Sequence, residues 1–404
     1  MRLVMTLKVR DEEDVIADNL RFHRALGVDH FIVMDNGSLD RTPEILQRFA
    51  DAGLAEVLRD ERGDLRALGA QWYTQMARLA ATELDADWVI NNDADEFWWP
   101  LSGTLKDALS AIPDRFGAVV APRAEFVGRP DGPGSFAERL VVREARSSLQ
   151  PKVAHRADPD VVVLHRGAHD VAAATGGDLW HALRPPGRAV HRSVRMETEL
   201  ADTEEDIRLV WAPMWPLRIF HFPLRSLEQF RRRTEISLRH GGFRDSGRFR
   251  RLRRYYEEGR LEELYDELIW SDAAVEEGIG AGHLVRDERF AKLLPRCPDP
   301  LGGSSAGTVP VEIGAPELER ERHEVELDAM RLMTRTQRFT MLRLNQAREQ
   351  IDRLHAEREL GRTRLNRTLG RRLLRLTRRL VGRPRKRPAP DDAAAATAEE
   401  PPRD

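Results

Sequence analysis

The sequence has a single cysteine, no long hydrophobic run and almost no net charge. Cys297 alone cannot form an intrachain disulfide, and one cysteine rules out a zinc or iron–sulfur site built from several. No apolar stretch reaches the roughly 18 residues that a membrane-spanning helix needs. The formal net charge of −2 argues against a uniformly basic nucleic-acid-binding protein, so nucleic acid is not an expected partner. Together these absences predict a cytoplasmic protein.

The 404 residues divide into an acidic body and a basic segment near the C-terminal end. Hydrophobic residues make up 41% of the chain, which is enough for a sizeable core and for two domains. Residues 361–387 hold twelve Lys or Arg and no acid, so the remainder must carry −14 to give the total of −2. This asymmetry bears on the partners of the protein rather than on its fold.

The first hundred residues alternate strand and helix patterns. Short apolar runs predict strands at 3–9, 30–34, 54–58 and 88–90. The segments between them have helical periodicity, so this part predicts an α/β fold with a mainly parallel sheet covered on both faces. From about residue 115, short apolar runs are separated by Gly/Pro-rich pieces, which predicts a mixed extension of the sheet with long loops.

Acidic residues directly follow the predicted strand at 88–90. In an extended segment, residues two apart point the same way, so we expect Asp93 and Asp95 to project together. Two carboxylates at the C-terminal end of a strand suit Mg²⁺ or Mn²⁺, and this is the edge where open α/β sheets bind ligands. The plainer alternative is an acidic surface turn.

Two further polar segments are expected at the same edge. Asp35 ends the second strand, where its carboxylate can accept hydrogen bonds from a base N–H or a ribose hydroxyl. Residues 38–42 are expected to form turns and to cap a helix that begins at Thr42. Arg10 and Glu12 follow the first strand. Three polar strand ends converging on one rim are what a nucleotide site requires.

With these segments in place, the N-terminal part resembles the nucleotide-binding half of family 2 glycosyltransferases, which have the GT-A fold. The resemblance is to a bacterial subgroup and rests on four motifs in order: Arg10-Asp11-Glu12, FHRALGVDH at 22–30, DNGSLDRT at 35–42 and DADEF at 93–97. It covers residues 1–130 well and 150–245 weakly. One departure is Asp11, which stands where the family more often has asparagine.

The resemblance implies a nucleotide-sugar donor and a divalent cation, Mg²⁺ or Mn²⁺. Asp35 would contact the base or ribose of the donor, with Arg10 and Glu12 lining the same site. Asp93 would lie at the ribose and metal side, and Asp95 would be the direct metal ligand. A cation held there would stabilise the charge on the departing nucleoside diphosphate.

The resemblance also implies an inverting reaction, in which an acceptor hydroxyl attacks the opposite face of the sugar and needs a general base. No clean Glu-Asp pair marks that base. Asp170 is a candidate base in a Gly/His segment, whereas Asp206 fits better as a helix N-terminal acid. His221, after a short predicted strand, is a candidate for catalysis, for a third metal ligand or for a structural role. Trp98 and Trp99 fit either core anchors or a platform for the sugar ring.

The C-terminal part suggests further partners. Leucines spaced by three or four run through 361–387, which predicts an amphipathic helix that binds an anionic membrane surface; a solvated helix or an oligomerisation surface is the alternative. Residues 317–360 predict a long helix with a partial coiled-coil seam, a candidate surface for a homo-oligomer. We therefore expect the protein to lie peripherally on the inner face of the cell membrane.

The predicted organisation has five parts: a nucleotide-sugar-binding half at 1–130, an acceptor-side half with a helical extension at 131–300, a linker at 301–316, a long helix with a basic arm at 317–387, and a disordered tail at 388–404. The predicted function is transfer of a sugar to a glycan or lipid-linked acceptor, in surface polysaccharide or glycolipid synthesis. Two other classes remain open. A nucleotidyltransferase would want a glycine-rich triphosphate loop, and residues 8–13 contain no glycine. A non-catalytic, membrane-associated scaffold would not hydrolyse a donor.

Overall fold

The computed structural model describes residues 1–60, 65–114, 116–163, 171–175, 178–181, 217–239, 247–302, 307–328 and 330–331. The chain divides into two compact units, 1–340 and 341–404, and every described residue lies in the first. The candidate base Asp170, the basic arm at 361–387 and the tail at 388–404 lie outside the described residues, as does the predicted coiled-coil seam beyond residue 331.

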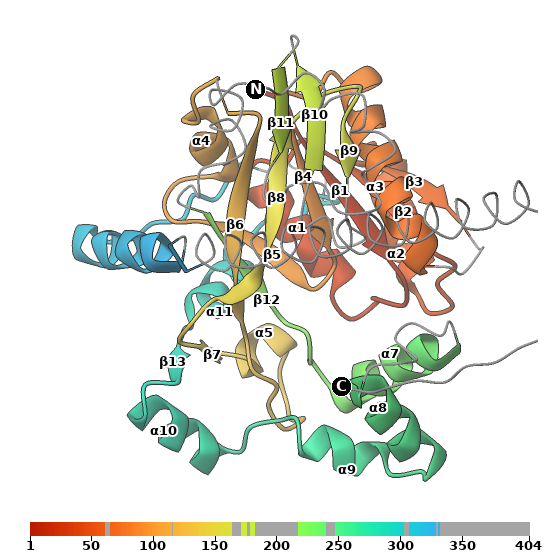
Figure 1. Cartoon of the computed structure of the whole chain (residues 1–404), viewed down its shortest axis with the longest axis vertical. Coiled ribbons are helices and arrows are strands. Elements are labelled where there is room, and N and C mark those ends of the chain that lie inside the picture. The colour runs from red at the N-terminus through yellow and green to blue at the C-terminus, as the bar shows by residue number, and fades with distance from the viewer. Residues whose placement is uncertain are drawn as a thin grey trace, which may run out of the picture. The chain divides into compact units, whose positions relative to one another are not determined.

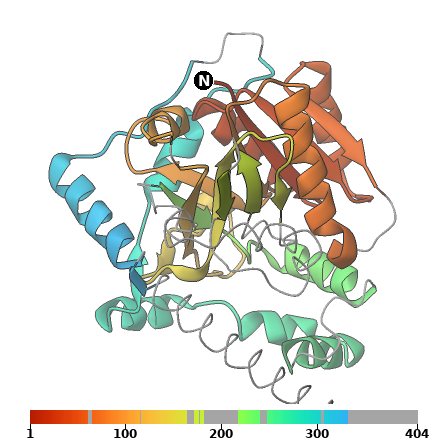
Figure 2. The same ribbon diagram turned by 45° about the horizontal axis from the view of Figure 1, so that its top comes forward.

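An eight-stranded mixed sheet forms the centre of the first unit (Figures 1 and 2), with the strand order β3-β2-β1-β4-β8-β6-β12-β5. The strands are β1 Leu3–Val9, β2 His30–Asp35, β3 Ala55–Arg59, β4 Trp88–Asp93, β5 Glu96–Pro100, β6 Ala118–Glu125, β8 Ser148–Arg156 and β12 Leu217–His221. The first four run parallel to one another. β8 is antiparallel to β4 and β6, and β5 is antiparallel to β12. The predicted α/β class with a mixed extension is confirmed.

Helices pack on both faces of this sheet, α1 and α2 on one face and α3 on the other. The described helices are α1 Ile16–Ala25, α2 Thr42–Asp51, α3 Leu65–Thr82, α4 Leu105–Ser110, α5 Phe136–Arg139, α7 Leu227–Arg239, α8 Gly247–Glu257, α9 Leu261–Asp266, α10 Asp272–Gly280 and α11 Arg289–Leu293, with a 3-10 turn, η3, at Leu294–Arg296. Two small sheets complete the described elements: β9 Val162–Val163 with β10 Val171–Thr175 and β11 Asp178–His181, and β7 Val142–Glu144 with β13 Leu284–Arg286. In the described part of the chain, no helix is both long enough and apolar enough to cross a bilayer.

Two separate apolar cores lie on the two faces of the sheet. On β1, Met5 belongs to the core shared with α1 and α2, whereas its neighbour Val4 belongs to the core under α3. This alternation is the period of two that a strand buried on both faces requires. Trp98 and Trp99 are both buried in the first core, so the sugar-platform interpretation is wrong and the two side chains are core anchors.

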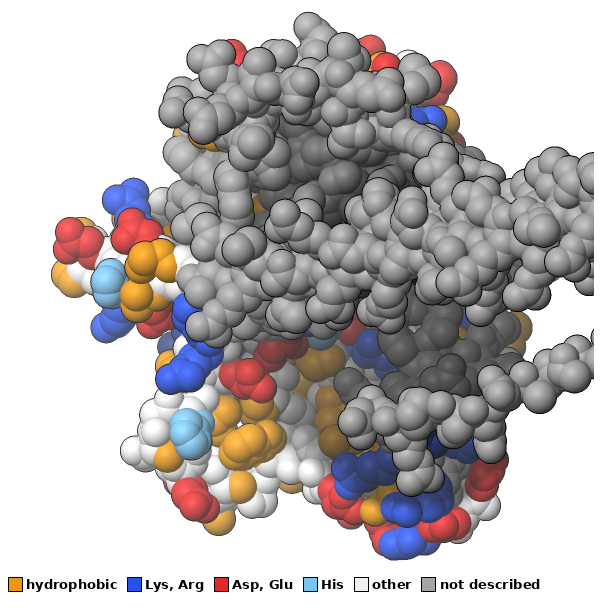
Figure 3. Space-filling model, viewed as in Figure 1, with side chains coloured by type: hydrophobic (Ala, Val, Ile, Leu, Met, Phe, Trp, Pro, Cys, Tyr) orange, Lys and Arg blue, Asp and Glu red, His pale blue; other side chains and the backbone are white. Residues whose placement is uncertain are grey.

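The region after β12 is helical, with one interruption that the sequence pattern did not predict. The pattern predicts one helix over 248–269, but the structure has α8 and α9 separated at Gly259. The φ angle of Gly259 is +70°, a left-handed conformation that glycine adopts at low cost and that ends a helix. On the face shown in Figure 3, Lys and Arg side chains over α8 and α9 lie beside Asp and Glu side chains. Arg251 pairs with Glu267 there.

The segment predicted as a linker is packed against the sheet and its helices over residues 307–314. The amide of Val309 donates to the carbonyl of Ala25 at 2.8 Å. Val311 exchanges two backbone hydrogen bonds with Gly103, at 2.8 and 2.9 Å, and its side chain is buried in the first core. This stretch therefore contributes backbone and apolar contacts to the first unit.

A helix over residues 315–328 follows and is tied to the sheet by buried charges. Arg218 of β12 and Arg143 of β7 are only 1% and 2% exposed. The guanidinium of Arg218 lies 3.3 Å from Glu324 and 3.7 Å from Glu321, and that of Arg143 lies 3.6 Å from Glu324. Arg143 also has Asp287 at 2.8 Å, so it is the buried Arg218 whose carboxylate partners come from this helix.

Candidate functional site

The C-terminal ends of β1, β2 and β4 meet at one edge of the sheet, as the sequence predicted. β1 lies between the other two strands, in a register that pairs Val9 with Asp35 and Lys8 with Asp93. The loops after β1 and β2 are joined by hydrogen bonds from the amides of Asp11, Glu12 and Glu13 to the side chains of Ser38, Thr42 and Asp40, at 2.9–3.0 Å. The first two polar segments therefore form one joined structure.

The turn-forming role predicted for residues 38–42 is confirmed, with one correction. The hydroxyl of Thr42 does not cap α2; it accepts the hydrogen bond from the amide of Glu12 instead. The carboxylate of Asp40 accepts the amide of Thr42 at 2.8 Å. Across the loop, Asp11 has a φ of +53°, a conformation that aspartate and asparagine tolerate better than other side chains. The departure from asparagine at this position therefore keeps the backbone shape.

Asp35 is buried, and one of its carboxylate oxygens is already used. Oδ1 accepts hydrogen bonds from the amide of Ser38 at 3.0 Å and from its hydroxyl at 2.6 Å. Beside it, the side-chain amide of Asn36 and the Nε of Arg10 are buried and have no hydrogen-bond partner among the described residues. Buried polar atoms without partners are rare. Donors and an acceptor beside Asp35 are therefore free to bind a ligand.

Asp93 is held from two sides. Tyr73 of α3 donates its hydroxyl hydrogen bond to Oδ1 at 2.8 Å, and Lys152 of β8 lies 2.6 Å from Oδ2. Lys152 is fully buried and also lies 3.0 Å from Glu96. Burial by itself would raise the pKa of the Asp93 carboxyl, but Lys152 and then Lys8 outweigh it and hold that pKa well below its usual range. Asp93 is therefore a carboxylate that is already neutralised by lysine.

Asp95 contacts a different set of groups. Its Oδ2 lies 3.5 Å from the Nε2 of His221, 3.3 Å from the guanidinium of Arg233 and 3.8 Å from that of Arg225. Burial would raise the pKa of Asp95, but His221 and the two arginines hold it well below its usual range. The structure thus brings together Asp95 and His221, which are 126 positions apart in the numbering.

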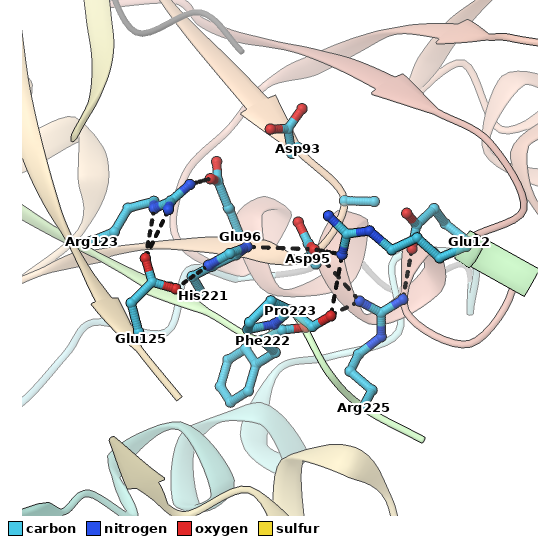
Figure 4. A network of polar contacts seen from close by, with 12 residues as sticks. Glu12, Asp93, Asp95, Glu96, Arg123, Glu125, His221, Phe222, Pro223 and Arg225 are labelled. Atoms are coloured by element: carbon cyan, nitrogen blue, oxygen red, sulfur yellow. Dashed lines mark hydrogen bonds and ion pairs between the residues drawn. The ribbon is translucent and has the colours of Figure 1, made fainter. Parts of the chain in front are cut away.

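The prediction that Asp93 and Asp95 project together is wrong. β4 runs on to Asp93, and residues 94–95 form a turn before β5 begins. In a turn the side chains do not keep the period of two that an extended segment has. Figure 4 shows Asp93 apart from the group around Asp95.

His221 joins Asp95 to a second set of charges (Figure 4). Its Nδ1 is hydrogen-bonded to Glu125 at the end of β6. Arg123 bridges Glu125, at 2.8 Å, and Glu96, at 3.2 Å. Burial would lower the pKa of His221, but Asp95 and then Glu125 outweigh it and raise the pKa to about 9. The imidazole is therefore held in a fixed orientation between two carboxylates.

Arg225 ties this group to the loop after β1. It is only 1% exposed, and its guanidinium lies 2.6 Å from Glu12 and 2.7 Å from Asp14. It also donates to the carbonyl of Phe222 at 3.1 Å. Burial raises the pKa of Glu12 to about 7 against the lowering effect of Arg225. Sequence reasoning did not find Arg225, Arg233 or Glu125, because the sequence between them and their partners carries no local pattern.

Two residues of α1 hold the turn that carries Asp95. The side-chain amide of Asn19 donates to the carbonyls of Ala94, at 2.9 Å, and Glu96, at 2.8 Å. Nε2 of His23 accepts the amide of Trp98 at 3.0 Å, and its Nδ1 lies 2.8 Å from the carbonyl of Asn19. Burial lowers the pKa of His23 to about 3, so the ring is neutral and Nε2 is free to accept. The shape of the turn is therefore fixed by buried hydrogen bonds.

Asp95 and His221 are of residue types that ligate divalent cations. A carboxylate oxygen faces an imidazole nitrogen whose opposite nitrogen is held by another carboxylate, which is the usual support of metal-binding histidines. Within the ranges that the structure describes, no group of three or more His, Cys, Asp or Glu side chains encloses a cation position. The pair therefore fits a divalent cation that takes its remaining ligands from a bound substrate and water.

Comparisons with known proteins gave partial structural likenesses. No family model matches the chain, and no curated protein is similar to it. S. aureus TarS 1–349 in complex with UDP is similar over 39% of this chain and 47% of its own, at 18% identity and a TM-score of 0.26. The same protein in complex with UDP-GlcNAc is similar over 39% of this chain and 46% of its own, at 17% identity and a TM-score of 0.27. Glucosyl-3-phosphoglycerate synthase from Mycobacterium tuberculosis, in complex with Mn²⁺, UDP and glucosyl-3-phosphoglycerate, is similar over 31% of this chain and 44% of its own. The identity is 22% and the TM-score 0.22. This chain thus spans less than half the length of each of these glycosyltransferase structures.

Proposed function

We propose that the protein is a glycosyltransferase that moves a sugar from a nucleotide-sugar donor to the hydroxyl of a glycan or lipid-linked acceptor, with Mg²⁺ or Mn²⁺. The observation that carries the proposal is the pairing of Asp95 with His221, itself supported by Glu125, at the same sheet edge as Asp35. A nucleoside diphosphate needs both a site for its base and ribose and a place for charge neutralisation. In this proposal the end of β2 at Asp35 supplies the first, and Asp95 with His221 supplies the second.

Each group has a defined task in this proposal. The Asp35 carboxylate and the unpartnered Asn36 amide bind the base or ribose, and Asp95 with His221 holds the cation. When bound, the cation acts as a Lewis acid that stabilises negative charge on the diphosphate. Asp93 remains the predicted contact on the ribose and metal side of the donor. Tyr73 and Lys152 fix the position of its carboxylate.

The chemistry is a displacement at the anomeric carbon of the sugar. The bond from that carbon to the diphosphate oxygen breaks, and its electron pair leaves with the nucleoside diphosphate. The acceptor oxygen forms the new bond from the opposite face, and its proton passes to a general base, for which Asp170 remains the candidate. The product is an inverted glycoside.

The test is a thermal-shift screen of nucleotide sugars with Mn²⁺ or Mg²⁺. A donor at a hundredfold excess over its dissociation constant should stabilise the protein by about 2.7 kcal/mol, and the stabilisation should disappear in chelator. Slow hydrolysis of the same donor by purified protein then separates a transferase from a non-catalytic scaffold. Release of pyrophosphate from a nucleoside triphosphate and a sugar phosphate would instead identify a nucleotidyltransferase.

Asp35→Ala is expected to weaken donor binding more than it slows the reaction. Asp35 lies at the end of β2, whereas the cation pair lies beyond β4 and on β12, so the reacting carbon is bound elsewhere. Steady-state kinetics should show a raised KM for the donor with kcat largely retained. Unchanged donor affinity together with lost turnover would show that Asp35 acts in the chemistry instead.

A further inference from the structure

Asp95 has more polar neighbours than its carboxylate can keep in contact while it binds a metal. Its Oδ2 lies within 4 Å of three nitrogen-bearing side chains: the guanidinium groups of Arg225 and Arg233 and the imidazole of His221. A divalent cation prefers carboxylate oxygen and brings two positive charges to it. At least one of the three side chains must then give up its contact with this oxygen.

Two of the three are fixed by other carboxylates. Arg225 is buried and bound by Glu12 and Asp14, so its position does not depend on Asp95. His221 is held through Nδ1 by Glu125 and presents its other nitrogen to Asp95. Both can therefore stay in place when a cation binds.

Arg233 differs from both in exposure and in partners. Its side chain is 55% exposed and extends from α7 to Asp95 at 3.3 Å. Its other contact is the carbonyl of Pro223, at 3.2 Å. Among the residues that the structure describes, Asp95 is the only carboxylate in ion-pair contact with Arg233. This is the side chain that a cation would displace.

A displaced arginine at this point lies within one side-chain length of any group bound to the cation. Guanidinium groups bind phosphate oxygens through two parallel hydrogen bonds, and a diphosphate on a cation at Asp95 offers such oxygens. We propose that Arg233 and the divalent cation compete for Asp95, and that the displaced Arg233 binds the diphosphate of the donor. This inference rests on the proposed function and adds Arg233 to its binding residues.

The two parts of the proposal predict changes of opposite sign in one variant. In Arg233→Ala, the affinity for Mn²⁺ alone should rise by about two- to fivefold, because an ion pair of this exposure is worth no more. The affinity for UDP, GDP or inorganic pyrophosphate in the presence of Mn²⁺ should fall by about tenfold or more. Electron paramagnetic resonance measures the first and calorimetric titration the second. Arg233→Lys should keep the Mn²⁺ affinity near that of the wild type and retain part of the diphosphate affinity.

Arg231→Ala is the matched control, because Arg231 lies on the same helix, is 46% exposed and pairs with Glu262 rather than Asp95. It should change neither affinity. If Arg233→Ala leaves Mn²⁺ binding unchanged or weaker, or leaves diphosphate binding unchanged, the proposal for Arg233 is wrong while the wild-type binding still supports the proposed function. A wild type that binds neither Mn²⁺ nor any of the three diphosphates overturns the proposed function itself.

Discussion

Asp95→Ala is expected to abolish sugar transfer while the protein remains folded. The variant loses the carboxylate that we assign to the cation, and with it the stabilisation of charge on the leaving diphosphate. Loss of one such electrostatic contact lowers turnover by about two to three orders of magnitude. The two buried side chains beside Asp95 keep other carboxylate partners, since Arg225 retains Glu12 and Asp14 and His221 retains Glu125, whereas Arg233 is 55% exposed. Transfer or donor hydrolysis should therefore fall with little change in the thermal unfolding temperature.

A companion measurement separates loss of the cation from loss of shape. Asp95→Asn keeps the size of the side chain and should also lose Mn²⁺ binding, because a neutral amide is a poor replacement for a carboxylate. Circular dichroism should show native secondary structure for both variants. Full activity of Asp95→Ala in the presence of chelator would remove the metal assignment.

Glu321→Gln is expected to destabilise the fold by about 3 kcal/mol, although it lies far along the chain from the proposed site. The carboxylate is only 6% exposed and lies near two guanidinium groups, those of Arg218, at 3.7 Å, and Arg289, at 3.1 Å. Removing its charge leaves the buried Arg218 with Glu324, at 3.3 Å, as its one remaining carboxylate in ion-pair contact among the described residues. Urea unfolding of the full chain measures the effect.

Glu319→Gln is the control, because Glu319 is exposed on the same helix. Its substitution should change the free energy of unfolding by no more than about 0.5 kcal/mol. The same reasoning predicts that a protein shortened after Gly314 unfolds more readily than one shortened after Thr340. Equal stability of the two would show that the helix is an independent attachment and that the predicted linker is a true boundary.

The sequence predicted the sheet edge well because its signals are local. β1, β2 and β4 were readable from short apolar runs, and the polar residues after each strand follow directly in the chain. Parallel strands then bring those residues together without further information. His221 could be proposed as a candidate for the same reason, since it ends a short apolar run.

The ion-pair partners of these residues could not be predicted from the sequence. Arg225 and Glu12 are 213 positions apart, and Arg233 and Asp95 are 138 apart. Charged side chains are common, so no spacing marks which arginine meets which acid. The predicted orientation of Asp93 and Asp95 was also wrong. It depends on a turn at 94–95, where side chains do not alternate as they do in a strand.

The way α1 holds the acidic turn has a consequence for sequence variation. Asn19 and His23 bind the carbonyls of Ala94 and Glu96 and the amide of Trp98, which are groups that every non-proline residue carries. The curvature of the turn therefore does not depend on which side chains it displays. Substitutions within the turn can alter ligand preference while the backbone path stays the same, whereas a change at Asn19 or His23 alters the path and leaves the displayed chemistry intact. Selection can thus act on the side chains of the turn and on its backbone path through different residue positions.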